Sequence, residues 1–307
     1  MSEDASLNSP ATRPTVTRVA SAKLNLALAV GRPTPETDGY HPIASWMVRV
    51  DLADDLTVTR LDDDRFSRYA IQWAADAPVR SPIDWSITKD LAVRAHLMLE
   101  HRAGRKLPVQ LRLDKRIPVG GGLGGASADA AAMLLAVNEL HALGLSLDEL
   151  ASVGAQLGSD VPFCLGQAPA FVSGLGERIR PSPSVRADVL LVLPDFGCPT
   201  GRVYAEFDEA PSPALRTDEI EAMAAAGTVD ADLLFNDLAD PAQRVAPRLG
   251  RVLEVLHDVS DGLGAHVTGS GSTCFVVCPD GPDQARMIGD DVEAELGDVR
   301  TVATRIV

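Results

Sequence analysis

The chain lacks any spacing of cysteine or histidine that is typical of a metal site. Its four cysteines form no CxxC pair, and its six histidines form no HxH or HxxxH pair. Cys274 and Cys278 flank three apolar residues in a strand-like run, which favours small core side chains over metal ligands. We therefore assign no metal site to these residues, and the cysteine usage indicates a reducing cytoplasm.

The chain also lacks a basic cluster and a long apolar segment near its start. Its 307 residues carry 28 Lys and Arg against 43 Asp and Glu, which gives a net charge of −15. A nucleic-acid-binding face needs clustered basic residues, so we expect no nucleic-acid partner. Residues 1–15 are rich in Ser, Thr, Pro and acidic side chains, and no signal-like or membrane-spanning stretch follows them. We expect a cytoplasmic protein with no membrane partner and a disordered extension over residues 1–15.

What the sequence does contain is a glycine-rich loop between a strand-like run, residues 109–113, and an alanine-rich segment, residues 130–140. Five of the six positions from 120 to 125 are glycine. Backbone N–H groups in such a loop converge on an anion, and the helix start that follows adds roughly half a positive charge. The loop therefore predicts a polyphosphate site in a nucleotide-using enzyme. A turn for tight strand–helix packing is the alternative.

The spacing of these glycines separates the known kinds of phosphate loop. No Lys stands beside Gly124 or Gly125, as a Walker A loop requires. Gly120, Gly122 and Gly125 fit a dinucleotide fingerprint, but that motif opens an N-terminal β-α-β unit with an acidic residue about 20 residues further on. Here the loop lies more than a third of the way along the chain, and Glu139 falls within the expected helix. An NAD-dependent oxidoreductase is therefore disfavoured.

The chain as a whole mixes strands and helices without strict β-α-β alternation, which favours an α+β fold. Ser146 and Glu149 have the capping-box spacing of a helix start. A polar, Pro-rich stretch, residues 180–187, marks the expected boundary between a first domain, 16–185, and a second, 186–307. We expect strands over residues 16–32, 45–52, 55–61, 109–113, 189–193, 266–268, 274–278 and 299–307, and helices over residues 91–100, 127–143, 146–157, 219–226, 246–258 and 284–296.

Three further segments place polar side chains at positions suited to chemistry. Lys23 and Asn25 lie on one face of an otherwise apolar strand, where a lysine must reach water or meet an anion. Asp160 lies in a turn directly before an apolar run, which suits a partly buried base. Residues 267–272 form a second Gly-Ser turn after a strand. Taken singly, these are more often an edge lysine, a helix-capping aspartate and a hairpin turn.

Together and in this order, the lysine–asparagine strand, the glycine loop and the late Gly-Ser-Gly turn resemble the three motifs of the GHMP small-molecule kinases. The loop sequence Gly-Gly-Gly-Leu-Gly-Gly-Ala-Ser, the turn Asp38-Gly39-Tyr40-His41 and the segment 157–163 are similar to the branch of that family that acts on a cytidyl diphosphate of methylerythritol. The resemblance covers nearly the whole chain from Val16 onward. It implies a two-domain GHMP kinase fold, with an N-terminal ribosomal-S5-like domain and a C-terminal ferredoxin-like domain.

The resemblance also implies a reaction: ATP-dependent phosphorylation of the 2-hydroxyl of 4-diphosphocytidyl-2-C-methyl-D-erythritol in the non-mevalonate isoprenoid pathway. Asp160 matches the family's catalytic base, and Lys23 matches the lysine that orients the hydroxyl and neutralises charge beside that base. Ser127 matches the serine that faces the phosphates and Mg²⁺, and no acidic ligand of the metal can be assigned. The implied ATP-binding residues are Pro118, Val119, Gly120, Gly121, Gly122, Leu123, Gly124, Gly125, Ala126, Ser127 and Ala128.

The implied substrate site includes the base of the substrate. Tyr40 and His41 match the pair that recognises cytosine, and Tyr204 matches an aromatic residue for the opposite face of the base. Stacking of this kind contributes about 1–3 kcal/mol in single-strand binders. Asn25 and Thr200 complete the implied substrate site.

The chain departs from the family pattern at two positions, and two other functions stay open. Asp90 stands where the family usually has Asn near the adenine pocket, and Ala126 replaces a commoner glycine. A homoserine or mevalonate type of GHMP kinase is disfavoured by the Asp-Gly-Tyr-His turn, because those substrates offer no base to stack. A non-catalytic ligand-binding homologue should have lost Lys23 or Asp160, and both are present. We expect a monomer or weak homodimer that acts on a small-molecule substrate.

Overall fold

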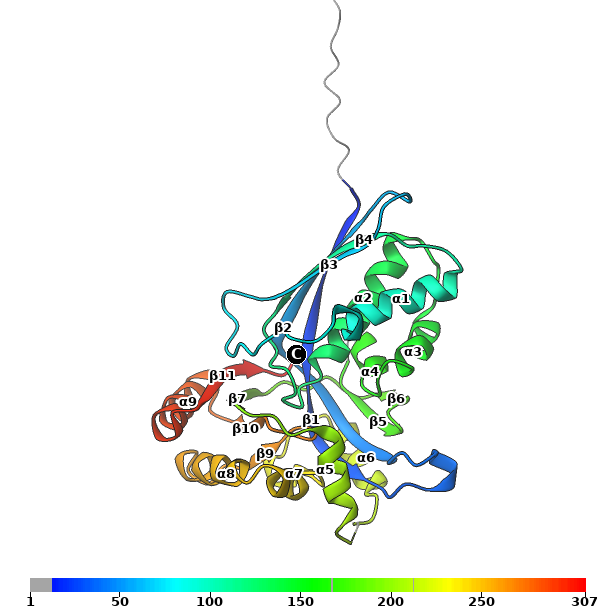
Figure 1. The fold of residues 1–307 in the computed structure, drawn as a ribbon. Helices are drawn as coiled ribbons and strands as arrows, with labels where there is room; N and C mark the ends of the chain where they lie inside the picture. The colour runs from blue at the N-terminus through cyan, green and yellow to red at the C-terminus, as the bar shows by residue number, and fades with distance from the viewer. Residues whose placement is uncertain (1–12, 167, 212) are drawn as a thin grey trace, which may run out of the picture.

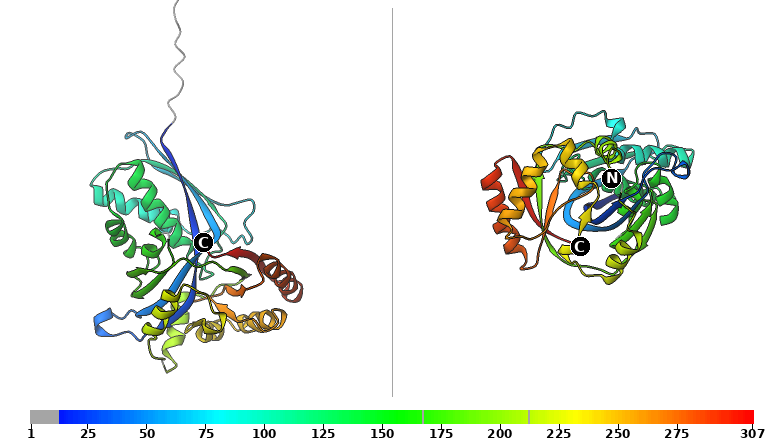
Figure 2. Two further views of the ribbon diagram at one scale, coloured as in Figure 1. Left: turned by 180° about the vertical axis from the view of Figure 1, so that it is seen from behind. Right: turned by 90° about the horizontal axis from the view of Figure 1, so that it is seen from below.

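The computed structural model describes residues 13–166, 168–211 and 213–307. Two long strands run through the molecule, with the helices of the first half on one side and a second, smaller sheet with its helices on the other (Figures 1 and 2). Of the predicted extension over residues 1–15, residues 1–12 lie outside the described part, and the first strand begins at Thr15. Among the described residues, no helix is long and apolar enough to cross a membrane.

The two long strands, β1 (Thr15–Val30) and β2 (Ile43–Arg60), pair antiparallel at the centre of a seven-stranded sheet. Its order is β3-β4-β2-β1-β8, and β5 pairs with both β2 and β6. The prediction of separate strands over 45–52 and 55–61 is wrong, because β2 continues through Asp54, which is fully buried and paired with Lys115. The remaining strands of this sheet are β3 (Arg68–Trp73), β4 (Val109–Lys115), β5 (Ala170–Gly174), β6 (Arg178–Pro181) and β8 (Phe235–Asn236).

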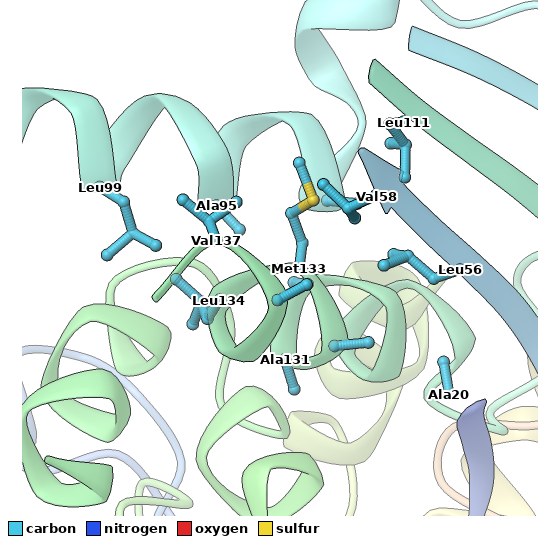
Figure 3. Packing of buried hydrophobic residues seen from close by; sticks show 14 of the residues in the cluster. Ala20, Leu56, Val58, Ala95, Leu99, Leu111, Ala131, Met133, Leu134 and Val137 are labelled. Atoms are coloured by element: carbon cyan, nitrogen blue, oxygen red, sulfur yellow. The ribbon is translucent and has the colours of Figure 1, made fainter. Parts of the chain in front are cut away.

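Four helices pack beside the first sheet: α1 (Leu91–Ala103), α2 (Gly125–Leu140), α3 (Leu147–Ala155) and α4 (Val161–Leu165). Figure 3 shows how buried side chains of α1 and α2 pack against β2 and β4, and these form one apolar cluster. The alanines of α2 allow this helix to lie close to its neighbours, so most of its length is buried. The predicted capping box is confirmed: Ser146 accepts from Glu149 N, and the Glu149 carboxylate accepts from Ser146 N.

The second sheet has the strand order β11-β7-β10-β9, with every neighbouring pair antiparallel. Its strands are β7 (Asp188–Pro194), β9 (Ala265–Val267), β10 (Cys274–Cys278) and β11 (Val299–Arg305). Numbered within this sheet alone, the order is 4-1-3-2, which confirms the expected ferredoxin-like arrangement. Cys274 and Cys278 are buried, as small core residues would be.

The helices of the second half are α5 (Thr200–Asp208), α6 (Thr217–Ala226), α7 (Ala239–Val245), α8 (Arg248–Val259) and α9 (Pro282–Leu296). The helix expected over 246–258 begins later, since Pro247 occupies the N-cap of α8 and the preceding residues belong to the end of α7. The two sheets are joined by more than a linker. β8 adds a parallel pair to β1, and Val50 of β2 bridges to Ile306.

Candidate active site

A cavity of about 460 Å³ lies between the first sheet, the N-terminus of α2 and the turn after β9. This volume is within the usual range for small-molecule sites. Most of the predicted site residues are on its wall: Lys23, Asn25, residues 118–127, Asp160, Thr200 and Tyr204. Ala128, Tyr40 and His41 are not. The fold therefore brings together the lysine–asparagine strand, the glycine loop and Asp160, which are far apart in the sequence.

Lys23 is buried on β1, with its ammonium directed at two oxygens. Its side chain is only 5% exposed, and Nζ donates to Asn25 Oδ1 at 2.6 Å and lies 3.6 Å from Asp160 Oδ2. The backbone N–H of Lys23 donates to Leu123 O at 2.9 Å, which ties β1 to the glycine loop. The β1–β2 register shifts on either side of this segment, and such bulges redirect side chains.

Asn25 holds that ammonium in place. Its amide Nδ2 donates to Ser45 Oγ at 2.8 Å, and Ser45 Oγ in turn donates to Ala27 O at 2.7 Å. These bonds fix which end of the amide is the oxygen, and that oxygen accepts from Lys23. The backbone N–H of Asn25 also donates to Thr268 Oγ1 at 3.1 Å, across 243 residues of sequence. Asn25 thus links the lysine to the turn after β9.

Asp160 precedes α4, but its carboxylate does not cap that helix. The side chain is 24% exposed and lies on the cavity wall beside the Lys23 ammonium. A carboxylate that is free of capping bonds and reachable from the cavity can accept a proton from a bound hydroxyl. The helix-capping alternative raised by the sequence is therefore not what the structure contains.

The glycine loop needs glycine for conformation and for space. Gly120, Gly122 and Gly124 have φ of 74°, 78° and 68°, a region that side chains rarely adopt. A Cβ at Gly122 would lie 2.3 Å from Thr268 O, and one at Gly124 would lie 2.8 Å from Lys23 Cγ. The loop ends at the start of α2, whose first turn has no acidic residue. Its N–H groups can therefore bind an anion at the cavity wall.

The turn after β9 is held by a residue that the sequence analysis missed. Asn236 Nδ2 donates to Val267 O at 2.7 Å and to Gly269 O at 2.8 Å, while its Oδ1 accepts from Leu238 N at 2.9 Å. One amide thus fixes three backbone groups. Ser270 of the same turn lies on the cavity wall, with its hydroxyl 3.0 Å from that of Thr200.

A second missed group is a buried cluster of one ammonium and two carboxylates at the cavity wall. Lys115 Nζ donates to Asp129 Oδ2 at 2.6 Å and also to Asp54 Oδ2. The other oxygen of Asp54 accepts from the backbone N–H groups of Arg116 and Ile117, which fixes the start of the glycine loop. Burial raises the pKa of Asp129, and the Lys115 ammonium opposes that rise. A period-two count along β4 would have shown that Lys115 lies on the buried face.

Asp90, which replaces the family's usual Asn, is the N-cap of α1. Its carboxylate accepts from Ala92 N at 2.9 Å and from Trp85 Nε1 at 3.3 Å. Asp90 and Trp85 line the cavity together with Lys89. The replacement keeps the capping role, since Asp and Asn are both good N-caps.

The aromatic residues predicted to hold a base are only partly gathered. Tyr204 lines the cavity, and the ring of His41 packs against it with the centroids 4.8 Å apart. Burial, and then the charge of Asp160, raise the pKa of Tyr204 to about 12. Tyr40 is 67% exposed and lies off the cavity wall.

The cavity wall contains most of the lysines of an acidic chain. The sequence has four lysines, Lys23, Lys89, Lys106 and Lys115, and three of them line the cavity. Only Lys106, 79% exposed, lies elsewhere. Three aspartates, Asp90, Asp129 and Asp160, line the same cavity, and Lys115 is paired with Asp54 and Asp129. An anionic ligand would therefore depend on Lys23, Lys89 and the N-terminus of α2.

The comparisons with known proteins agree with this geometry. The GHMP kinases N terminal domain matches residues 90–167, and the GHMP kinases C terminal domain matches residues 213–290. The chain is 38% identical over 286 residues to the 4-diphosphocytidyl-2-C-methyl-D-erythritol kinase of Caulobacter sp. (strain K31), with 90% of each chain covered. It is 37% identical over 280 residues to the kinase of the same name from Nocardioides sp. (strain ATCC BAA-499 / JS614), with 89% of this chain and 91% of the relative covered.

Solved structures give the same result for the fold. A crystal structure of 4-(cytidine 5'-diphospho)-2C-methyl-D-erythritol kinase matches with a TM-score of 0.74 and 32% identity, covering 95% of this chain and 99% of the other. Homoserine kinase from Cytophaga hutchinsonii matches with a TM-score of 0.66 at 16% identity, a likeness of fold alone. The chain is therefore a GHMP kinase, and within that superfamily it belongs to the family of 4-diphosphocytidyl-2-C-methyl-D-erythritol kinases.

Proposed function

We propose that this kinase transfers the γ-phosphoryl group of ATP to the 2-hydroxyl of 4-diphosphocytidyl-2-C-methyl-D-erythritol. The observation that carries the proposal is the Lys23–Asp160 pair, with 3.6 Å between ammonium and carboxylate, at the wall of a cavity that also contains the glycine loop. The relatives' names supply the identity of the substrate.

Asp160 accepts the proton of the attacking hydroxyl, and Lys23 orients that hydroxyl and stabilises the charge on Asp160. Phosphoryl transfer depends on positioning and charge stabilisation more than on covalent help, so a base, a cation and an amide cradle suffice. Asn25 keeps Lys23 in place through the 2.6 Å bond to its ammonium. The loop over residues 118–128 supplies the N–H groups for the ATP phosphates.

The site suits a magnesium ion carried largely by the nucleotide. Within the described residues, no group of three His, Cys, Asp or Glu is placed to hold a metal ion, so the donor set does not form a protein cage. Ser127, at the start of α2 and on the cavity wall, is the residue that would contact the ion. Mg²⁺ favours oxygen ligands and usually keeps several waters, and it supplies charge neutralisation on the phosphates.

Tyr204, with Thr200 beside it on the cavity wall, supports a substrate that carries a base. His41 packs against Tyr204, whereas Tyr40, the residue before it, is exposed. The base site would therefore use Tyr204 and His41 as they stand, and Tyr40 would join them when the ligand binds.

The four free cysteines support a reducing, cytoplasmic setting. A monomer or weak homodimer acts without a nucleic-acid partner.

A coupled assay of ADP release tests the proposal. The purified chain with ATP and Mg²⁺ is given the cytidyl substrate, homoserine or mevalonate at equal concentration, with a sample lacking any acceptor alcohol as background. We expect ADP release above background with the cytidyl substrate, and release at the background rate with homoserine or mevalonate. Equal turnover of homoserine or mevalonate would show that the kinase has another specificity.

A further inference from the structure

An acidic residue outside the cavity, Asp208, contacts His41 of the proposed base site. The ring of His41 packs against the cavity-lining Tyr204 and the more deeply buried Phe207, with ring centroids 4.8 Å and 5.9 Å away. Its Nε2 lies 3.0 Å from Oδ1 of Asp208, the last residue of α5. The His41 side chain is 13% exposed and the Asp208 side chain is 36% exposed, so the histidine end of this contact is the one screened from water.

The contact with Asp208 determines which ring nitrogen of His41 carries the proton. An ionised carboxylate can only accept a hydrogen bond, so Nε2 must be the donor. In the neutral imidazole, Nδ1 is then left without a proton and acts as an acceptor. The ring cannot easily turn over to exchange the two nitrogens, because Tyr204 and Phe207 pack against it.

A base that meets Nδ1 of His41 must therefore offer a donor. Cytosine presents an exocyclic amino group on its polar edge, whereas uracil presents a carbonyl oxygen at the same place. We propose that Asp208 is a positioning residue which selects cytosine over uracil by holding His41 in the tautomer that accepts at Nδ1. This inference rests on the proposed function and adds the residue that sets the base specificity of that site.

Asp208 is itself anchored in a way that permits a clean substitution. Arg32 donates to the backbone oxygens of Asp208 and Ala210, and its guanidinium lies 3.5 Å from Asp208 Oδ1. The two backbone contacts do not depend on the carboxylate, so the end of α5 stays attached when the side chain changes. Glu209 is an exposed acid on the next residue and provides a matched control.

The test compares the cytidyl substrate with its uridyl analogue in wild type, Asp208→Asn, Asp208→Ala and Glu209→Gln. All assays are run at one fixed, mildly alkaline pH. An amide at position 208 can donate to Nε2, which moves the ring proton to Nδ1 and favours the carbonyl of uracil. We expect wild type and Glu209→Gln to prefer the cytidyl substrate in kcat/KM by about tenfold or more, and both Asp208 variants to lose most of that ratio.

A binding measurement without turnover separates this inference from the proposed function. Titration calorimetry with cytidine diphosphate and uridine diphosphate should show the same loss of preference in both Asp208 variants. Retention of the wild-type ratio in Asp208→Asn and Asp208→Ala would overturn the inference and leave the proposed function standing. An equal loss with both bases, together with a lower Tm, would assign Asp208 a structural role and also overturn it. A wild-type chain that ignores the cytidyl substrate would overturn the proposed function itself.

Discussion

The proposed chemistry depends most directly on the carboxylate of Asp160. We predict that Asp160→Asn loses about 10²–10⁴-fold in kcat, because the amide cannot accept the hydroxyl proton. KM values for ATP and for the cytidyl substrate should change little, since the amide has the same shape. Steady-state kinetics measure both quantities. A variant with near wild-type kcat would mean that the base is another group.

His141 carries a consequence for stability rather than activity. It lies at the C-cap of α2 and is 4% exposed, and within the described residues neither ring nitrogen has a hydrogen-bond partner. Burial, and then the charge of Arg60, lower the pKa of His141 to about 4. The ordinary value is about 6.5, so the folded state disfavours the charged ring. Stability from this residue is therefore present above pH about 6.5 and is lost as the pH falls toward 4.

We predict that His141→Leu reduces the pH dependence of unfolding. The wild-type free energy of unfolding should fall by about 2 kcal/mol more than that of the variant between about pH 7.5 and about pH 5. Urea unfolding at the two pH values measures the difference. His257→Leu, a change at an exposed histidine, is the control and should behave as wild type. The same pH dependence in His141→Leu and wild type would show that His141 titrates normally.

At the scale of the elements, the glycine loop makes close contact with the turn after β9, and this contact can be separated from backbone strain. Gly120 and Gly122 have nearly equal φ, 74° and 78°. Among the described residues, a Cβ at Gly120 meets no atom within 4 Å, whereas one at Gly122 lies 2.3 Å from Thr268 O. A side chain at either position therefore has the same conformational cost, but only a side chain at Gly122 collides with Thr268.

We predict that Gly122→Ala raises the KM for ATP and lowers kcat, so that its kcat/KM falls at least tenfold below that of Gly120→Ala. Gly120→Ala shows only the loss due to strain, about 1–2 kcal/mol, which Gly122→Ala shares. Both variants are compared in kcat, KM and Tm. Equal losses in the two would show that contact between the loop and the turn contributes nothing to the site.

The elements with strong periodicity could be predicted from the sequence, whereas the short strands that depend on pairing with other strands were missed. The apolar alternation of β1 and β10 and the alanine-rich start of α2 carry their own signal, so they were placed to within a few residues. β5 and β6 are short, and their only described ladder partners are β2 and each other, so their pattern is weak outside the fold. The break expected between residues 52 and 55 falls on Asp54, whose ion-pair partner Lys115 is 61 residues away in the sequence.

The residues of the candidate site also divide into those that the sequence predicts and those that it does not. Lys23, Asp160 and the glycine loop were found because their types and order resemble a family. Asn236 and Asp208 act through contacts with distant segments, such as the 2.8 Å bond from Asn236 to Gly269 and the 3.0 Å approach of Asp208 to His41. No local pattern marks these two residues, since an Asn after a Phe and an Asp at a helix end are ordinary on a surface.

At the scale of the whole molecule, the two sheets act as one support for the site. β1 supplies Lys23 and Asn25, α2 supplies its N-terminus, and the second half supplies the turn after β9. β8 pairs with β1 at residues 27 and 28, only a few positions beyond Asn25. A shift of the second half relative to the first would therefore move the turn directly against the lysine.

The chain has four lysines, three of them around the cavity, so it offers few sites to amine-reactive probes. An acylating reagent will find Lys106 and Lys89, which are exposed, and will leave the buried Lys23 and Lys115 largely unmodified. We predict that ATP protects Lys89 and leaves Lys106 unaffected, as peptide mass spectrometry with and without nucleotide would measure. Labelling of Lys89 that ignores ATP would place the nucleotide away from this wall. Lys106 acts as an internal standard in every sample, so the native chain can report occupancy of its own site without an introduced label.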